Sequence, residues 1–112
     1  MEELLKQKCV ACRADAPRVT DDELPDLIQQ IPDWQPITKD SILMLNRVFK
    51  FDDYAQSLEF TKKVAALAEE EDHHPAILLE WGRVEVTWWS HKIKGLHKND
   101  FIAAAKTDAL NS

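Results

Sequence analysis

The sequence predicts an α+β domain in which a four-stranded, antiparallel sheet carries three helices on one face. Segments with helical spacing of apolar residues alternate with strand-like segments in the order α-β-β-α-β-β-α. The last two strand-like segments flank Gly82-Arg83, a short connection typical of a hairpin. A chain of 112 residues is long enough for one packed core and short for two domains.

The first helix is expected from about Asp21 to Ile31. It follows a capping box, Thr20-Asp-Asp-Glu23, in which a hydroxyl and a carboxylate satisfy backbone amides that the first turn leaves unpaired. Four apolar side chains then recur at helical spacing: Leu24, Leu27, Ile28 and Ile31. Pro32-Asp33 ends the pattern.

Two extended segments are expected next. Trp34 to Ile37 is short, and Ile42 to Phe51 is longer, with apolar side chains on both faces at one end. The second helix is expected from Asp52 to Glu71, capped by Asp52 or Asp53. Its stripe of small apolar residues permits close approach to a sheet.

The second pair of strands is expected at Ile77 to Trp81 and Val84 to His91, before a third helix from Asp100 to Leu110. The last strand alternates, so its residues divide between two faces. The more apolar face, which should meet the helices, comprises Val84, Val86, Trp88 and Ser90. His91 and Trp89 therefore belong to the opposite face.

Composition excludes several classes of function. The formal net charge is −6 and the 14 Lys and Arg residues are scattered among acids, which argues against direct nucleic-acid binding. With two glycines and no phosphate-binding glycine motif, nucleotide binding of that kind is unsupported. No long apolar run or apolar leader is present, so we expect no membrane association and a cytoplasmic protein.

Residues 1–19 are expected to form a mobile or loosely packed arm before a single domain of residues 20–112. The arm contains Cys9-Val-Ala-Cys12, which lacks both the further ligands of a zinc site and the βαβ setting of a redox motif. The cysteines are expected to be free thiols. A metal shared with another site or subunit is the alternative.

The chemistry is expected to gather at Glu69-Glu-Glu-Asp-His-His-Pro75, where a helical pattern gives way to strands. Pro75 biases His74 away from the helical region, so His73 and His74 should lie in an exposed, extended turn. One interpretation is a polar surface turn with a solvated acidic end. The other is that the carboxylates raise the pKa values of the histidines and keep a protonated imidazole available near neutral pH.

Three spaced motifs together resemble the pterin-4a-carbinolamine dehydratase family. They are Glu69-x-x-x-His73-His74-Pro75, Val84-x-Val-x-x-x-Ser90-His91 and Gly95-Leu96-x-x-x-Asp100. The resemblance runs from about Thr20 to Leu110 and includes the order of elements given above.

Two departures from the family pattern stand out. Ala76-Ile77 replaces an aromatic residue after the His-Pro step, and Leu96-His97 replaces Leu-Thr. Because the threonine would cap the last helix, either His97 or Asn99 must do so here, or the helix starts a little looser. Neither departure touches the three histidines, so the departures put substrate affinity in question more than activity.

The resemblance implies removal of water from 4a-hydroxytetrahydropterin, with no metal or cofactor, in the recycling of tetrahydropterin for aromatic amino acid hydroxylation. It implies that His73 and His91 are the acid–base pair and that His74 binds and orients the pterin. Asp100 would hold the His91 tautomer or lie in a supporting position, and Glu69 would bond a histidine or the pterin. The remaining substrate-binding residues expected are Pro75 and Trp34. For Trp34, core packing is an equal alternative.

The expected partners are a pterin, an aromatic amino acid hydroxylase and further copies of the chain, as a homodimer or homotetramer formed through an exposed sheet edge or face. A second hypothesis is a non-catalytic interaction module, because the family also resembles a dimerisation cofactor of a homeodomain transcription factor. Metal binding by the histidines with Cys9 and Cys12 is disfavoured, since adjacent histidines on an extended segment point apart. Replacing His73 or His74 by alanine should lower turnover without unfolding.

Overall fold

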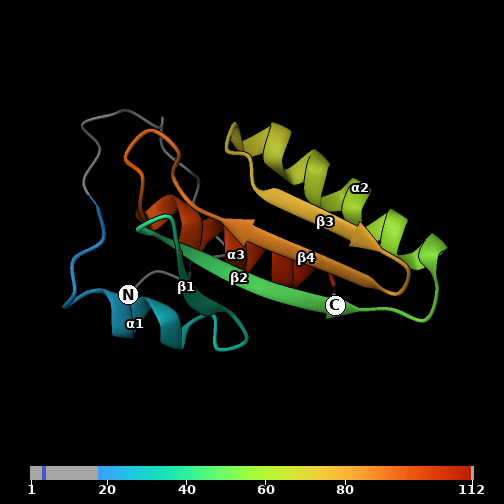
Figure 1. Cartoon of the computed structure of the whole chain (residues 1–112), viewed down its shortest axis with the longest axis horizontal. Helices are drawn as coiled ribbons and strands as arrows, with labels where there is room; N and C mark the ends of the chain where they lie inside the picture. The colour runs from blue at the N-terminus through green and yellow to red at the C-terminus, as the bar shows by residue number, and fades with distance from the viewer. Residues whose placement is uncertain (1–3, 5–17, 112) are drawn as a thin grey trace.

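A computed structural model of the chain confirms the predicted fold class (Figure 1). It describes Leu4 and residues 18–111. The elements in chain order are α1 (Leu24–Gln29), β1 (Gln35–Lys39), β2 (Ile42–Lys50), α2 (Tyr54–Glu71), β3 (Ala76–Glu80), β4 (Arg83–Trp88) and α3 (Lys98–Leu110).

The four strands form one antiparallel sheet in the order β1-β2-β4-β3. The two central strands are β2 and β4, with Leu45 opposite Trp88 and Phe49 opposite Val84. All four of these side chains are buried, so the centre of the sheet is also the floor of the core. The outer strands, β1 and β3, are the two edges.

The helices cover one face of this sheet. Figure 1 shows α2 and α3 running along the sheet, and both contact β4. The inward-facing residues of β4, Val84, Val86 and Trp88, are fully buried, as the alternation of that strand predicts. Leu27 of α1 belongs to the same core.

The segment before residue 18 is described only at Leu4, which is buried in the core. At that residue the expectation of a loosely packed arm is wrong. Arg18 and Val19 are also tied to the domain, through bonds from the Arg18 guanidinium to the Ile93 carbonyl and from the Val19 amide to the Leu96 carbonyl. Cys9 and Cys12 lie outside the described residues, and the division into an arm and a domain remains a prediction.

Element boundaries differ from expectation where local capping decides them. The reciprocal bonds between Thr20 and Glu23 form as predicted, but they close a turn and α1 begins only at Leu24. Asp53 caps α2 by accepting the Gln56 amide at 2.8 Å. Strand β4 ends at Trp88, three residues earlier than expected.

The acidic end of α2 is partly neutralised by specific partners. Acidic side chains are unfavourable at the negative end of a helix dipole. Glu71 forms an ion pair with Lys106 of α3 in a largely buried position. Asp72 follows in a left-handed conformation, φ 51°, which turns the chain toward the sheet. The pair therefore fixes the end of α2 immediately before the two histidines.

Gly82 is required at the turn between β3 and β4. Its φ is +68°, and an added Cβ would lie 3.0 Å from the carbonyl oxygen of Phe51. We expect Gly82→Ala to lower the free energy of unfolding by about 1–2 kcal/mol, because both the left-handed backbone and the close approach oppose a side chain. Chemical denaturation measures the loss.

Gly95→Ala is the matched control for that substitution. The Cβ added at Gly95 meets only the flexible Arg18 side chain, at 3.3 Å or more, and the backbone is not left-handed. A loss at Gly95 as large as that at Gly82 would contradict the explanation from backbone conformation.

Candidate active site

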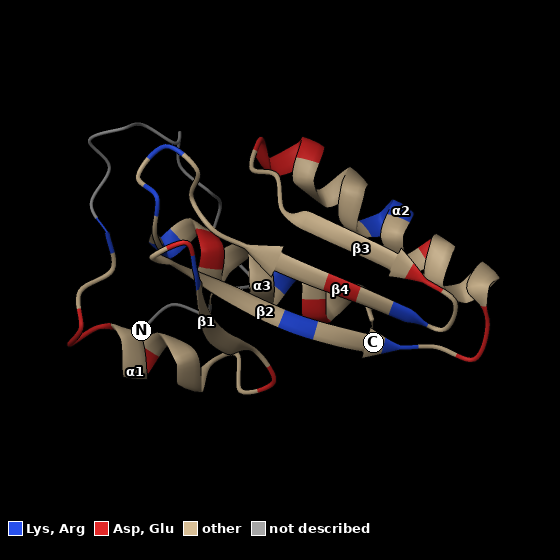
Figure 2. Ribbon diagram, viewed as in Figure 1, with Lys and Arg blue, Asp and Glu red and all other residues tan. Residues whose placement is uncertain are grey.

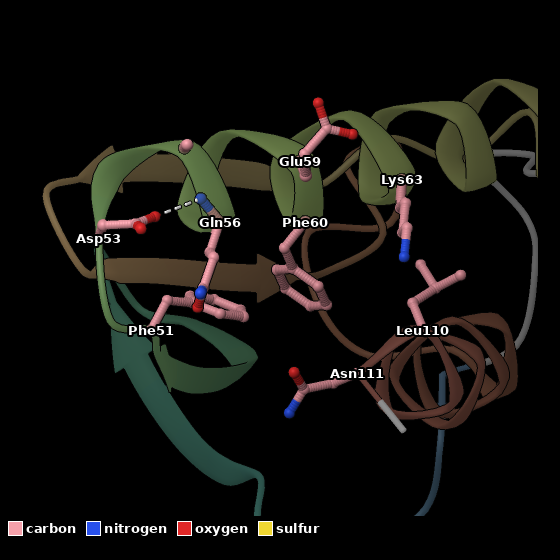
Figure 3. A pocket seen from close by; sticks show the side chains of 9 residues that line it. Phe51, Asp53, Gln56, Glu59, Phe60, Lys63, Leu110 and Asn111 are labelled. Carbon is pink, nitrogen blue, oxygen red and sulfur yellow. Dashed lines mark hydrogen bonds between the residues drawn. The ribbon is translucent and has the colours of Figure 1, made fainter.

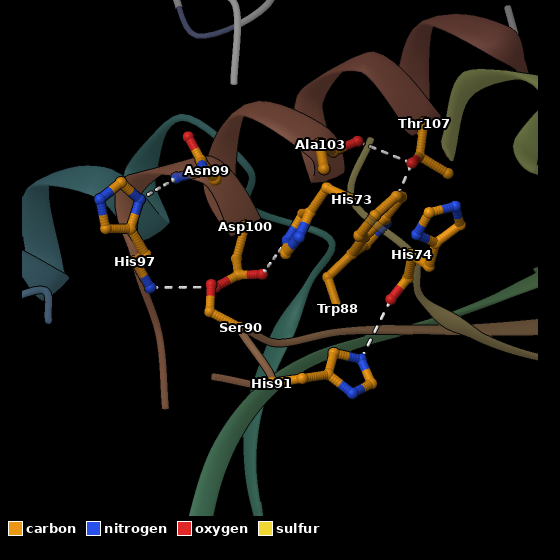
Figure 4. A network of polar contacts seen from close by, with 10 residues as sticks. All are labelled: His73, His74, Trp88, Ser90, His91, His97, Asn99, Asp100, Ala103 and Thr107. Atoms are coloured by element: carbon orange, nitrogen blue, oxygen red, sulfur yellow. Dashed lines mark hydrogen bonds and ion pairs between the residues drawn. The ribbon is translucent and has the colours of Figure 1, made fainter. Parts of the chain in front are cut away.

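A buried carboxylate, Asp100 in the first turn of α3, lies at the centre of the histidine region (Figure 4). Its side chain is fully buried. Its Oδ1 lies 2.6 Å from Nε2 of His73, and its Oδ2 accepts the Ser90 hydroxyl at 2.8 Å and the His97 amide at 2.9 Å. Three donors from two segments, the α2–β3 and β4–α3 connections, therefore satisfy this buried group.

His73 is held between Asp100 and Trp88. Its ring stacks on the indole of Trp88, with centroids 5.3 Å apart and planes 25° from parallel. The Trp88 indole donates to the Thr107 hydroxyl at 3.1 Å, which in turn donates to the Ala103 carbonyl. His73 is only 5% exposed, so the expectation of an exposed turn is wrong for this residue.

His74 faces the solvent, as expected for this turn. Its Nε2 lies 2.6 Å from Oε2 of Glu69, a residue on the last turn of α2 that is itself exposed. Of the two bonding partners that the sequence leaves open for Glu69, a histidine or a ligand, the structure shows the histidine. Pro75 follows directly and leads into β3.

His91 reaches the same region from the segment after β4. Its Nε2 donates to the main-chain carbonyl of His74 at 3.2 Å. Its ring also stacks on Trp89, with centroids 4.2 Å apart and planes 25° from parallel. His73 and His74 come from the α2–β3 connection, so this bond brings two segments distant in sequence into contact (Figure 4).

The contacts of Asp100 and Trp34 bear on the alternatives that the sequence leaves open for each residue. Asp100 bonds to His73 and the described contacts do not join it to His91, which favours the supporting position. Trp34 is buried in the core, stacks edge-on against Phe49 and donates its indole hydrogen to Asp108 at 2.8 Å. That placement favours core packing for Trp34 over contact with a ligand.

Sequence reasoning missed the roles of Ser90, Trp88 and Trp89. The alternation of the strand predicted at Val84 to His91 places Ser90 and Trp88 on the buried face, where a hydroxyl and an indole N–H each need a partner. That need is the signal that could have pointed to Asp100 and Thr107. Nothing comparable in the sequence indicates that Trp89 stacks on His91.

His97 caps α3, as one of the two alternatives predicted. Its Nδ1 accepts the Asn99 amide at 3.0 Å, and Asp100 returns a bond to the His97 amide. Burial lowers the pKa of His97, an effect that nearby Asp100 opposes and His73 reinforces. The neutral ring is required here, because a protonated Nδ1 cannot accept the Asn99 amide.

This cap predicts a pH-dependent stability. The folded-state pKa of His97 lies below its unfolded value of about 6.5, so its contribution is fully present above that pH and is lost as pH falls through the folded pKa. On acidification the wild type should lose about 0.5–2 kcal/mol of unfolding free energy as this cap fails. We expect His97→Thr, whose hydroxyl caps the helix without titrating, to lack this loss. Unfolding free energies of both proteins from pH 7.5 downward measure it; identical pH slopes would contradict the assignment.

A separate hollow of about 430 Å³ lies between the start of α2 and the end of α3 (Figure 3). Phe51, Phe60 and Leu110 form its apolar part, and no histidine lines it. It therefore offers none of the acid–base chemistry of the histidine region.

The placement of basic residues, metal ligands and apolar helices in the described part of the chain also bears on function. Figure 2 shows Lys and Arg positions interspersed with Asp and Glu along the ribbon of these residues. Among Leu4 and residues 18–111, no three or more His, Cys, Asp and Glu side chains are grouped to hold a metal ion. No helix in these residues is long and apolar enough to cross a membrane.

The family model for pterin 4 alpha carbinolamine dehydratase matches residues 17–110. The chain belongs to this family. A protein of Nitrosococcus oceani named "Putative pterin-4-alpha-carbinolamine dehydratase" is 62% identical over 110 residues, which cover 98% of this chain and 97% of the relative. The predicted assignment to an enzyme family of carbon–oxygen lyases is thus confirmed.

Two solved structures share the dehydratase fold. A transcriptional coactivator/pterin dehydratase from Brucella melitensis is 30% identical with a TM-score of 0.77, covering 86% of this chain and all of the other. A pterin dehydratase-like protein described as a RuBisCO assembly factor in the alpha-carboxysome is 32% identical with a TM-score of 0.59, covering 70% of this chain and 88% of the other.

Proposed function

We propose that this protein removes water from 4a-hydroxytetrahydropterin to give quinonoid dihydropterin, with His73 and His91 as the acid–base pair and His74 orienting the pterin. The observation that carries the proposal is the bond from His91 to the His74 main chain, which brings His91 to the segment that carries His73 and His74. Membership of the dehydratase family supports the choice of reaction.

The reaction needs an acid and a base that work near neutral pH. The 4a-hydroxyl leaves as water once it receives a proton, the N5–H proton is removed, and the N5 electron pair forms the N5=C4a double bond. Imidazoles suit both proton transfers, and each well-placed group contributes about 10²–10⁴-fold. Two histidines thereby supply the whole of the proton transfer, and the protons are exchanged with water after each turnover.

The surroundings of the histidines fit these different roles. Asp100 fixes His73 from the core side, and Glu69 fixes His74 at the surface. Pro75 stiffens the segment that carries both rings. We infer that the pterin lies against the exposed His74–Pro75 surface, within reach of His91.

The test is the rate at which quinonoid dihydropterin forms from freshly generated 4a-hydroxytetrahydropterin, followed by absorbance, with and without the protein. Spontaneous dehydration sets the baseline. Clear acceleration is expected. A rate equal to that of buffer would contradict the proposal.

We also infer that the product serves the recycling of tetrahydropterin for an aromatic amino acid hydroxylase in the cytoplasm. The support is the family and the chemistry of the substrate, which such a hydroxylase releases. In a coupled assay with a hydroxylase, in which dehydration of 4a-hydroxytetrahydropterin is the slow step, adding the protein should raise the steady-state rate of amino acid hydroxylation. An unchanged rate under those conditions would contradict this role.

A non-catalytic interaction role is the second candidate. It is favoured by the descriptions of two structural relatives, one as a transcriptional coactivator and one as an assembly factor. Partner binding alone gives no reason for two imidazoles that each bond a carboxylate, with a third bonded to the main chain of His74. Failure of the dehydration assay, followed by retention of a protein partner that does not depend on His91, would favour this alternative.

We propose further that two copies associate through β3. Strand β1 is protected as an edge by Pro36 and Lys39, whereas β3 contains neither residue type and exposes Leu78 at 51%. Trp81, in the adjoining turn, is 71% exposed. An unprotected edge beside exposed apolar side chains favours pairing with a second sheet.

Leu78→Lys is expected to shift this association toward monomer, because it places a charge on the pairing edge while leaving the core intact. Size-exclusion chromatography with light scattering at micromolar concentration measures the mass. Thr38→Lys on β1 is the control and should retain the wild-type mass. A wild-type protein that is strictly monomeric would contradict the proposal.

A further inference from the structure

The three histidines share one feature that the proposed reaction leaves unexplained. Each is bonded through Nε2 to an oxygen: His73 to Asp100 Oδ1, His74 to Glu69 Oε2 and His91 to the His74 carbonyl. Carboxylate and carbonyl oxygens accept hydrogen bonds, so Nε2 carries the hydrogen in each ring. In the neutral ring the lone pair then belongs to Nδ1.

His91 differs from the other two in its acceptor. A main-chain carbonyl cannot change its protonation state, whereas Asp100 and Glu69 are titratable. His91 is also exposed, while His73 is buried. The bond from His91 Nε2 to the His74 carbonyl can therefore persist through a catalytic cycle. Nδ1, on the other side of the ring, is directed away from that carbonyl.

Trp89 restricts the ring of His91 from a second direction. Trp88, the last residue of β4, packs in the core, whereas the next residue, Trp89, is half-buried and stacks on His91. A single hydrogen bond at 3.2 Å leaves an exposed ring free to tilt. The stacked indole, 4.2 Å from the His91 ring centre, covers one face and removes much of that freedom.

We propose that Trp89 is a positioning residue that holds His91 as the Nε2–H tautomer with Nδ1 free to take the N5 proton of the pterin. This inference rests on the proposed dehydratase function. The proton moves from N5 to Nδ1 as the N5=C4a bond forms and the C4a–oxygen bond breaks, with the oxygen leaving as water after protonation by the acid. His91 then returns its proton to solvent.

The tautomer is tested without any substrate. Long-range proton–nitrogen NMR correlation on protein labelled with ¹⁵N-histidine distinguishes the two neutral tautomers of each ring. We expect His91, assigned from the spectrum of His91→Gln, to be Nε2–H in wild type. A spectrum with the hydrogen on Nδ1 would overturn the inference whether or not the protein is a dehydratase.

The positioning role is tested by two substitutions at Trp89. Trp89→Leu removes the stacked ring and should lower kcat about 10- to 100-fold with little change in KM, since misplacement of a reacting group has costs of this order. Trp89→Phe keeps an aromatic face and should recover most of the loss. Tyr54→Leu, which removes a distant exposed aromatic side chain, should match wild type.

The outcomes separate the two claims. Wild-type kcat in Trp89→Leu, or a loss that Trp89→Phe does not recover, would overturn the positioning role. A wild-type protein that fails to accelerate dehydration would overturn the proposed function, and the NMR spectrum would still decide the tautomer. Thermal melts of both Trp89 variants near that of wild type are expected, because the side chain lies outside the core.

Discussion

Asp100→Ala is expected to lower the free energy of unfolding by about 3–5 kcal/mol and to abolish most dehydratase activity. The carboxylate is fully buried and accepts from His73, Ser90 and the His97 amide. Alanine would leave three buried donors without an acceptor, and removing one partner of a buried charged network costs on this order. Chemical denaturation and the dehydration assay measure the two losses.

Asp100→Asn separates the structural part from the chemical part. The amide oxygen can still accept from Ser90 and the His97 backbone, but its NH₂ group would then face Nε2 of His73. His73 must move its hydrogen to Nδ1 to accept that donor. We expect a smaller loss of stability than in Asp100→Ala and a comparable loss of activity.

Asp108→Asn on the same helix is the control for both Asp100 variants. Asp108 accepts from Trp34 and Arg47 through Oδ1, which asparagine retains, so its bonds go to these two residues and not to a histidine. Activity near that of wild type is expected. If Asp108→Asn proved as damaging as Asp100→Asn, the special role of the Asp100 network would be contradicted.

His73→Ala and His91→Ala are expected to differ in stability while both lose activity. Each should lower kcat by about 10²–10⁴-fold. His73 is buried against Trp88 and bonded to Asp100, so its removal should also cost about 1–3 kcal/mol. His91 is exposed and should melt close to wild type.

The burial of His73 adds a loss of stability to the expectation drawn from the sequence, in which His73→Ala and His74→Ala lower turnover without unfolding the protein. The expectation is unchanged for His74, whose ring is exposed. Circular dichroism melts of the three alanine variants decide the point. Equal melting temperatures for His73→Ala and His91→Ala would show that the burial of His73 contributes little to folding.

The fold could be predicted because its local patterns agree with one another. Alternation in β4, helical spacing in α2 and the caps at Thr20 and Asp53 all specify the same elements. Boundaries were less certain, because β4 ends where Ser90 turns to pair with Gly95 and bond Asp100. Such long-range bonds leave no periodic signal.

The candidate site could be predicted as a set of residues but not as an arrangement. The motifs identify the three histidines, Glu69 and Asp100, and the structure joins them in one region. The contacts between these residues could not be predicted in the same way. Which histidine Asp100 contacts depends on how α3 crosses the sheet, and the burial of His73 depends on Trp88. For Trp34 the sequence leaves core packing and ligand contact equally open, and the structure shows the ring packed against Phe49.

The most direct measurement is the single-turnover rate of quinonoid dihydropterin formation from 4a-hydroxytetrahydropterin by wild type and by His91→Ala, each compared with spontaneous dehydration. His91→Ala is the informative variant because its fold should be intact. The account predicts strong acceleration by wild type and a loss of about 10²–10⁴-fold in the variant. Equal rates for the two proteins would contradict the central role given to His91.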